Sequence, residues 1–247
     1  MDLKTFFEEN HSVALGFSGG VDSSYLLYSA LHYGAQVKAY YVKTAFQPQF
    51  ELEDALRIAK ELRAEVCVIE IDVLSNAAVA ANPANRCYYC KKEVFGAISQ
   101  KASEDGYSVL IDGSNASDDA NDRPGMKALT ELEILSPLRM CGLNKDSIRH
   151  LSKEAGLFTW NKPAYACLAT RIATDRHITR HLLSKVERSE GALAHMGFTD
   201  FRVRLMGDDA KLQLPQEQME KAVRDRKAIL TVLEDDFNNI MLDLKGR

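Results

Sequence analysis

Two groups of residues in this 247-residue chain have the types and spacing that chemistry requires. The first is the stretch SGGVDSS at residues 18–24, where two glycines stand beside hydroxyls and one carboxylate. The second is a set of thiols, in which Cys87 and Cys90 form a CxxC and Cys167 follows far downstream. Glycines beside hydroxyls suit phosphate binding, and grouped thiols suit metal binding or nucleophilic chemistry.

Residues 18–24 predict a phosphate loop at the start of a helix. Gly19 and Gly20 allow the backbone to approach a ligand closely, and the amides of a helix N-terminus are unpaired donors that favour anions. Further donors are the hydroxyls of Ser18, Ser23 and Ser24. Asp22 would repel phosphate unless Mg²⁺ lies between them, so it is the expected magnesium ligand. A plain capped turn is the alternative, because the stretch is neither a lysine-bearing P-loop nor a GxGxxG fingerprint.

Three interpretations fit the thiols. A structural zinc site closes with four ligands, so it would need Cys141 in addition to Cys87, Cys90 and Cys167. A redox pair would use the CxxC alone, and an iron–sulfur cluster would use the CxxC with Cys167. The spacing does not choose among them. Cys67, inside an apolar segment, is expected to be a buried small residue, and Cys141 is expected to be structural.

The elements that must position these residues follow from hydrophobic patterning. Apolar strands are expected at residues 12–17, 36–42, 65–73 and 108–113, and helices between them at 22–33, 50–64 and 91–106. Apolar strands that alternate with helices predict an α/β fold with a doubly wound parallel sheet. Ligands bind at the carboxyl ends of such strands, where residues 18–24 lie.

The order of elements changes after a helix at residues 144–157, which Asn144 caps and Gly156 ends. A helix is expected at 178–197, a hairpin at 201–215 with its turn at 207–210, a helix at 215–233 and a strand at 240–244. This order predicts a smaller C-terminal α+β domain with an antiparallel sheet. We therefore expect two domains, residues 1–165 and residues 166–247.

Within the expected hairpin, alternation puts Arg202 and Arg204 on one face of a strand and its apolar residues on the other. Paired guanidiniums suit bidentate recognition of phosphate. The alternative is a solvated outer face.

Composition narrows the class of protein. A net charge of −4 disfavours a broad nucleic-acid surface, and 46% hydrophobic with 27% charged residues is ordinary for a soluble globular protein. The sequence shows neither a signal peptide nor an apolar run near the ~18 residues of a membrane span. Five cysteines without a leader indicate a reducing compartment, so a cytoplasmic location is expected. The six histidines form no HxH or HExxH pattern.

The stretch SGGVDS after a buried strand resembles the pyrophosphate loop of the ATP pyrophosphatase (PP-loop) superfamily, whose fold is adenine nucleotide alpha hydrolase-like. That resemblance implies cleavage of ATP between its α and β phosphates and adenylation of an acceptor oxygen.

Longer stretches resemble the LarE family of ATP-dependent sulfur transferases. They are CYYCKKEVF, DGSNASDDANDRPGMKALTELEILSPL, NKDSIRHLSKEAGL, NKPAYACLATRI and GFTDFRVR, in order along most of the chain. The resemblance implies that a carboxylate of pyridinium-3,5-biscarboxylic acid mononucleotide is adenylated and converted to a thiocarboxylate, on the route to the nickel-pincer nucleotide cofactor. It also implies a homo-oligomer, often a hexamer.

Two sulfur-donor schemes occur in that family. In one, the cysteine matching Cys167 attacks the acyl-adenylate, gives up its own sulfur and becomes dehydroalanine. In the other, cysteines matching Cys87, Cys90 and Cys167 hold a 4Fe–4S cluster that carries an extra sulfide. All three are present, so the cluster scheme is expected.

The resemblance also implies that Arg202 and Arg204 bind the substrate phosphate and that Glu190 matches an acid thought to assist near the sulfur. Further expected site residues rest on their positions. Lys91 would orient an anionic substrate in preference to Lys92, Arg171 would favour the Cys167 thiolate or contact pyrophosphate, and Asp119, or its neighbour Asp118, would hold Mg²⁺ or substrate. The stretch AKLQL departs from the family pattern, so Lys211 and Gln213 receive no role.

Other functions remain open at this point. A tRNA thiolase shares the loop and sometimes the three-cysteine cluster. An amidating ligase of the NAD or GMP synthetase kind shares the loop but gives no reason for the cysteines. A non-catalytic nucleotide sensor would bind ATP without releasing pyrophosphate. We expect a small nucleotide substrate, with no nucleic-acid or membrane partner.

Overall fold

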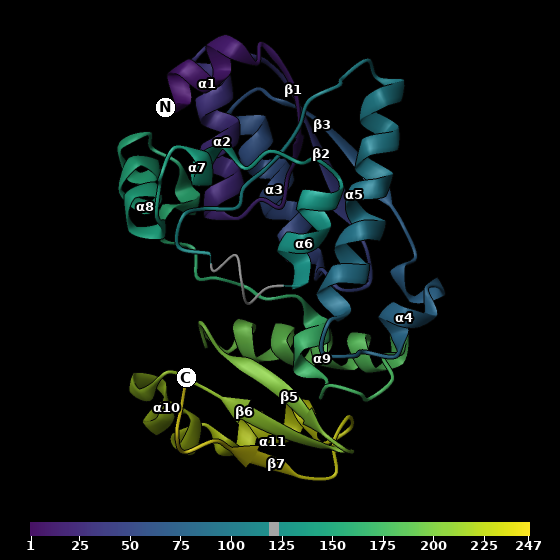
Figure 1. Cartoon of the computed structure of the whole chain (residues 1–247). Coiled ribbons are helices and arrows are strands. Elements are labelled where there is room, and N and C mark those ends of the chain that lie inside the picture. Colours follow the sequence, from purple (N-terminus) through teal and green to yellow (C-terminus); the bar gives the residue numbers. More distant parts are fainter. Residues whose placement is uncertain (119–123) are drawn as a thin grey trace. The chain divides into compact units, whose positions relative to one another are not determined.

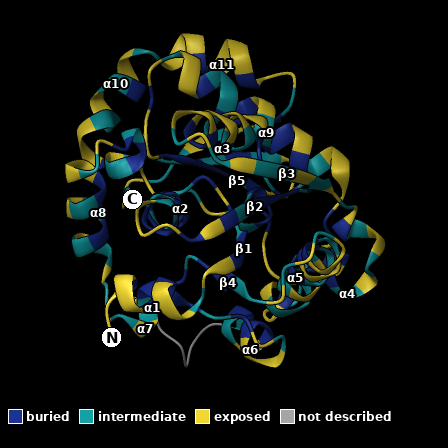
Figure 2. Cartoon of the chain, turned by 90° about the horizontal axis from the view of Figure 1, so that it is seen from above, coloured by how far each residue is buried: buried dark blue, intermediate teal, exposed yellow. Residues whose placement is uncertain are grey.

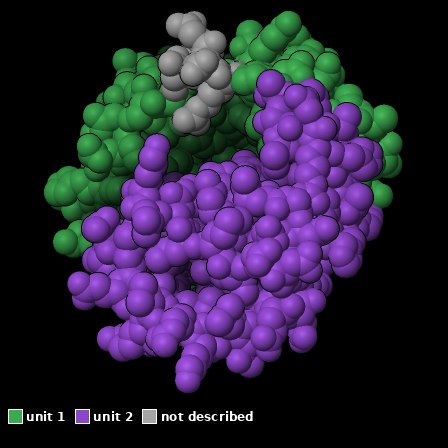
Figure 3. Space-filling model, turned by 90° about the horizontal axis from the view of Figure 1, so that it is seen from below, with its two compact units in different colours: residues 1–79, 85–162 green, residues 80–84, 163–247 purple. Residues whose placement is uncertain are grey.

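The computed structural model describes residues 1–118 and 124–247, which form two compact units. Unit 1 comprises Met1–Val79 and Asn85–Lys162, and unit 2 comprises Ala80–Ala84 and Pro163–Arg247 (Figure 3). The short segment Ala80–Ala84 belongs to unit 2 because its backbone is bonded there: the Ala80 carbonyl accepts from the Ile178 amide at 2.7 Å.

Unit 1 is built on a four-stranded parallel sheet in the order β3-β2-β1-β4 (Figure 1). The strands are β1 (Ser12–Gly16), β2 (Gln36–Lys43), β3 (Glu65–Glu70) and β4 (Leu110–Asp112). Leu15 of the central β1 is fully buried and pairs in register with Ala39 of β2 and Ile111 of β4. The predicted α/β fold with a parallel sheet is confirmed.

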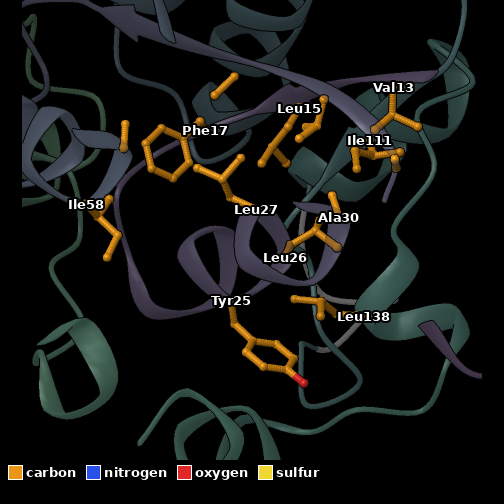
Figure 4. Packing of buried hydrophobic residues seen from close by; sticks show 14 of the residues in the cluster. Val13, Leu15, Phe17, Tyr25, Leu26, Leu27, Ala30, Ile58, Ile111 and Leu138 are labelled. Carbon is orange, nitrogen blue, oxygen red and sulfur yellow. The ribbon is translucent and has the colours of Figure 1, made fainter. Parts of the chain in front are cut away.

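Helices cover both faces of this sheet. The helices in this part of the chain are α1 (Leu3–Glu9), α2 (Val21–His32), α3 (Gln49–Glu61), α4 (Ala77–Ala80), α5 (Arg86–Glu104), α6 (Pro124–Glu131), α7 (Pro137–Met140) and α8 (Lys145–Glu154), and all but α4 pack on the sheet. One face packs on α1, α2, α3, α7 and α8, where Leu15, Leu26 and Ile58 belong to one buried cluster (Figure 4). The other face packs on α5 and α6 around Tyr40 and Phe95. The central strands are therefore buried, whereas the helices keep exposed outer turns (Figure 2).

Unit 2 contains a three-stranded sheet in the order β5-β6-β7. Its elements are α9 (Arg180–His195), β5 (Arg202–Met206), β6 (Asp209–Gln213), α10 (Met219–Arg224), α11 (Arg226–Leu233) and β7 (Ile240–Leu242). β5 and β6 form the predicted antiparallel hairpin, but β7 pairs with β6 in parallel. The expectation of a fully antiparallel sheet is therefore wrong, because a strand reached through a helical crossover runs parallel to the strand it left.

Two further expectations need correction. The helix expected at 215–233 is divided at Asp225, which ends α10 and begins α11. The helix expected to begin at residue 91 begins at Arg86, so the CxxC lies inside α5 and not before it. Within the described residues, the structure contains no helix with the length and hydrophobicity that crossing a membrane requires.

Candidate active site

The loop between β1 and α2 is shaped by Gly19. Its φ of +69° lies in the left-handed region, and a Cβ atom there would lie 2.7 Å from both Cα and Cβ of Ala55 in α3. Glycine is thus required both by the backbone conformation and by close packing against α3. The tight turn brings the chain from the sheet directly into the first turn of α2.

Hydroxyl groups hold the loop in shape. Ser23 Oγ accepts from the Ser18 amide at 3.3 Å, lies 3.0 Å from Ser18 Oγ and donates to the Gly20 carbonyl at 3.3 Å. Gly20 is the N-cap of α2 and supplies no side-chain cap. Amides of a first helical turn have no partner within the helix, so this end of α2 is an anion-binding terminus. Ser18 is exposed beside it.

Asp22, in the first turn of α2, has two carboxylate oxygens in different situations. Oδ2 accepts from Lys145 Nζ at 2.5 Å, whereas Oδ1 is buried with no hydrogen-bond partner among the described residues. Burial raises the pKa of Asp22, an effect that the Lys145 hydrogen bond only partly offsets. A buried carboxylate oxygen without a donor fits the expected role of magnesium ligand.

Lys145 is a candidate site residue that sequence reasoning missed. It is the first residue of α8, which the predicted Asn144 caps through a 2.9 Å hydrogen bond from the Ser147 amide. A cation in the first turn of a helix opposes the helix dipole, so its position could have marked it as functional. The fold brings it to Asp22 from 123 positions away.

The remaining expected residues near this loop divide into three cases. Ser24 is fully buried and its Oγ has no hydrogen-bond partner among the described residues, so its expected contact with nucleotide stays a prediction. Asp118 accepts from the Asn115 amide at 3.0 Å and contributes a negative charge near Asp22. Asp119 lies outside the described residues.

The CxxC lies in the first turns of α5. Cys87 is exposed and Cys90 is half-buried, and a spacing of three residues puts both on one face of the helix. The buried guanidinium of Arg86 lies with Nη2 3.7 Å from Cys87 Sγ. All five cysteines of the chain are thiols and not disulfides. Thiolates are the usual ligands of iron–sulfur clusters, so the donor chemistry of Cys87, Cys90 and Cys167 fits the expected cluster.

Two lysines follow the CxxC. Lys92 Nζ donates to Glu131 at 3.1 Å, in a cluster where Tyr88 also donates to Glu131. Lys92 is therefore explained as one partner of a surface ion pair with Glu131. The side chain of Lys91 lies against Gly125 of α6, because a Cβ atom added to Gly125 would lie 2.9 Å from Lys91 Cδ.

The other two cysteines pack against apolar residues. Cys67 lies against the cluster that contains Tyr40 and Phe95, and Cys141 lies against the cluster that contains Leu15. Burial raises the pKa of the Cys141 thiol. Among the described residues, no three His, Cys, Asp or Glu side chains gather as a metal site. The packing of Cys141 disfavours the four-thiolate zinc interpretation.

In unit 2, Cys167 is half-buried and precedes the 3₁₀ helix Leu168–Arg171. Arg171 and Glu190, expected separately as site residues, form one buried ion pair with Nε–Oε1 at 2.8 Å and Nη2–Oε2 at 3.0 Å. Tyr165 donates to the same carboxylate at 2.5 Å. The structure thus brings three residues around Cys167 into one network.

Arg202 and Arg204 do not lie on a solvated outer face. Arg202 is buried and donates to the carbonyls of Phe201 at 2.6 Å and Ala164 at 2.7 Å. Arg204 donates to Gln213 Oε1 and to the Thr170 carbonyl, and its Nη2 donates to none of the described residues. Gln213 in turn donates to Asp243, which also pairs with Lys211.

This group of arginines carries excess positive charge. Burial, together with the charges of Arg171 and Arg247, lowers the pKa of Arg202 to about 10. Burial and the same two charges lower the pKa of Arg204. Guanidiniums that repel one another at partly buried positions favour an anionic ligand.

The sequence was compared with protein families and with known proteins. The family model described as thiamine biosynthesis protein (ThiI) matches residues 7–194. The pyridinium-3,5-bisthiocarboxylic acid mononucleotide synthase of Lactiplantibacillus plantarum is 30% identical, over 95% of this chain and 86% of its own. An uncharacterized protein of Synechocystis sp. is 34% identical, over 99% and 93%. A tRNA-specific 2-thiouridylase of Thermotoga sp. is 24% identical, over 61% of this chain and 54% of its own.

The ThiI match covers the whole loop region and both halves of the thiol set, and the similarity to the synthase extends across both units. The chain therefore belongs to the ThiI family of the PP-loop superfamily and, within it, to the LarE group of ATP-dependent sulfurtransferases.

Proposed function

We propose that the chain uses ATP to convert a carboxylate of pyridinium-3,5-biscarboxylic acid mononucleotide to a thiocarboxylate, in the biosynthesis of the nickel-pincer nucleotide cofactor. The synthase from Lactiplantibacillus plantarum, named for the bisthiocarboxylic acid product, supports this substrate. The observation that carries the proposal is the Asp22 carboxylate, with one oxygen paired to Lys145 and the other buried and unpaired at the anion-binding end of α2.

In the first step, the loop binds ATP with Mg²⁺. Ser18 and the open amides after Gly20 would hold phosphate oxygens, and Asp22 would hold the Mg²⁺ that bridges to them. Lys145 orients the Asp22 carboxylate and favours its ionised form, and its own charge favours the phosphates. A substrate carboxylate oxygen attacks the α-phosphorus, pyrophosphate leaves, and the product is an acyl-adenylate.

In the second step, sulfur replaces the activated oxygen. AMP is a far better leaving group than oxide, so a sulfide that attacks the acyl carbon yields a thiocarboxylate and AMP. When bound, a 4Fe–4S cluster on Cys87, Cys90 and Cys167 supplies a renewable carrier for that sulfide. In the alternative scheme, Cys167 attacks directly and is left as dehydroalanine. The three-thiol set favours the cluster scheme.

Substrate binding is assigned to unit 2. The Nη2 atom of Arg204 and the charge of Arg202 would bind the nucleotide phosphate, because the charges of Arg171 and Arg247 lower the pKa of both guanidiniums and an anion would relieve that repulsion. Lys91 would orient the second carboxylate. By family resemblance we further propose that the protein is a homo-oligomer, as a hexamer.

One assay tests the proposal against its rivals. The protein is incubated with ATP, Mg²⁺ and sulfide, together with the biscarboxylate mononucleotide, a tRNA transcript or no acceptor. We expect pyrophosphate, and a product heavier by one oxygen-to-sulfur exchange, only with the mononucleotide. Thiolated tRNA would support the thiouridylase function of more distant relatives. ATP binding without pyrophosphate in every arm would indicate a nucleotide sensor.

A further inference from the structure

The carboxylate of Glu190 is saturated with donors from the protein. Oε1 accepts from Arg171 Nε at 2.8 Å and from the Val203 amide at 2.9 Å, and Oε2 accepts from Arg171 Nη2 at 3.0 Å and Tyr165 Oη at 2.5 Å. A carboxylate offers about four lone-pair sites. All of them are used, so Glu190 has no site left at which to take a proton from a substrate.

The pair is also closed to solvent. The side chain of Arg171 is 0% exposed and that of Glu190 is 6% exposed. Each charge compensates the other in a setting where a lone charge would be costly, so protonation of Glu190 would leave a buried guanidinium unpaired. The ring of Tyr165 covers the pair, with its centroid 4.6 Å from the Arg171 guanidinium carbon.

The third guanidinium nitrogen of Arg171, Nη1, donates hydrogen bonds to the segment that carries Cys167. It donates to the Ala166 carbonyl at 2.7 Å, to Thr170 Oγ1 at 2.8 Å and to the Cys167 carbonyl at 3.3 Å. The Cys167 carbonyl also accepts from the Thr170 amide at 3.0 Å and from Thr170 Oγ1 at 2.8 Å. The peptide group beside the thiol is therefore held by three donors.

The ends of the same segment are held by the two arginines of β5. Arg202 Nη2 donates to the Ala164 carbonyl and Arg204 Nη1 to the Thr170 carbonyl, each at 2.7 Å. Arg171 holds the middle of this segment through its bonds to the Ala166 and Cys167 carbonyls, and the ion pair with Glu190 holds Arg171 in place. Glu190 also connects α9 to β5, because it accepts a hydrogen bond from the Val203 amide. The segment that carries Cys167 is therefore bonded, through Arg171 and Glu190, to both of these elements.

We propose that Glu190 and Arg171 are positioning residues that fix the backbone around Cys167, and that Glu190 does not act as an acid or base. This assignment rests on the proposed function only for the statement that Cys167 takes part in sulfur transfer. It replaces the role implied for Glu190 by resemblance, that of an acid near the sulfur.

The test uses the full-length protein, reduced and freed of metal with a chelator, so that no bound metal shields the thiol. Glu190→Gln, Arg171→Lys and Tyr165→Phe are compared with wild type. The matched control is Arg188→Lys, on the same helix α9, whose exposed side chain pairs with Asp236 at 2.7 Å and with no other described residue. Amide hydrogen exchange is followed by peptide, and alkylation of Cys167 by iodoacetamide is followed by mass spectrometry.

Because charge-assisted bonds hold the segment, Glu190→Gln and Arg171→Lys should speed exchange across residues 163–172 by about tenfold or more, and alkylation of Cys167 by about fivefold or more. Exchange in the β5–β6 hairpin and in the control should stay at the wild-type rate. Tyr165→Phe removes one of the four hydrogen bonds to the Glu190 carboxylate, so it should give smaller increases in exchange and alkylation. This variant alone tests the assignment if the other two do not fold.

The opposite result would be wild-type exchange and wild-type alkylation of Cys167 in both Glu190→Gln and Tyr165→Phe. That pattern is expected of a general acid or base and would overturn the assignment. Neither measurement needs the substrate or ATP. Failure of the proposed reaction would therefore leave this test valid, and failure of this test would leave the reaction standing.

Discussion

Lys145 Nζ lies 2.5 Å from Asp22 Oδ2, so the first turn of α8 places a cation directly on the carboxylate in the first turn of α2. Two helix N-termini thereby meet at the carboxyl end of β1. The hydrogen bond from Lys145 offsets part of the rise that burial causes in the pKa of Asp22, and the second carboxylate oxygen is buried with no hydrogen-bond partner among the described residues.

Replacement of Lys145 by methionine tests this relationship. Without its partner, Asp22 loses the hydrogen bond that counters desolvation, so its pKa should rise further. Loss of a hydrogen bond between charged groups should lower the rate of pyrophosphate release by about ten- to a hundredfold, and higher Mg²⁺ should restore part of it. Lys153→Met, on the exposed side of the same helix, is the control. Equal rates in the two variants would remove Lys145 from the site.

The raised pKa of Asp22 predicts opposite effects on stability and activity. A carboxylate whose pKa is higher in the folded state binds protons more readily when folded, so the folded state loses stability as the pH rises from the unfolded pKa through the folded one. Asp22→Asn should therefore unfold at the same or a higher temperature than wild type at neutral pH, yet release no pyrophosphate. A variant that is both unstable and inactive would contradict the sign of this shift.

The pH dependence of adenylation follows from the same group. Magnesium binding needs the ionised carboxylate, so pyrophosphate release should fall, as the pH is lowered, at a pH above the ordinary range of an aspartate. In Lys145→Met, this acidic limb should move to higher pH. An acidic limb that does not move between the two proteins would show that another group controls it.

Gly19 and Gly20 should differ in their tolerance of a side chain. Gly19→Ala forces a left-handed residue against Ala55 and should lower the free energy of unfolding by about 2–5 kcal/mol. Gly20 has φ −78° and its added Cβ would meet only Ser18 Oγ at 3.4 Å, so Gly20→Ala should cost no more than about 1 kcal/mol. Urea denaturation measures both. Equal losses would mean that the contact with α3 does not define the loop.

The thiols should separate into two classes. Anaerobically prepared protein should contain iron and acid-labile sulfide, and replacement of Cys87, Cys90 or Cys167 by serine should remove both. Cys141→Ser, at a thiol packed against the core, should keep the iron and lose only stability. Iron-free wild-type protein in which Cys167 becomes dehydroalanine after turnover would establish the sacrificial scheme instead.

The sequence predicts the elements whose signals are local. The β1–loop–α2 unit, the Asn144 cap and the β5–β6 hairpin each depend on a few neighbouring residues, and the structure contains them where expected. The start of α5 was missed because Cys-Tyr-Tyr-Cys has low helix propensity. Farther along α5, Phe95 and Ile98 are buried against the sheet, in the part of the helix that was predicted.

The contacts of the site depend on long-range pairing that periodicity does not encode. Lys145 meets Asp22 across most of unit 1, and Arg171 meets Glu190 across a loop and half of a helix. Arg171 was a candidate by its position and Glu190 by resemblance, and Lys145 was not a candidate, because the sequence could not say which charges neutralise one another. For the same reason, Arg202 and Arg204 were placed on the correct strand, while their bonds to the Cys167 segment were not foreseen.

The most direct measurement of the central claim follows an oxygen atom. The mononucleotide is prepared with heavy oxygen in its carboxylates and incubated with the protein, ATP, Mg²⁺ and sulfide. If a carboxylate is adenylated, one heavy oxygen must leave with AMP, and the product must carry sulfur in its place. We predict labelled AMP, unlabelled pyrophosphate and one label lost per sulfur gained. Unlabelled AMP, or ADP with free phosphate, would contradict activation of the carboxylate at this loop.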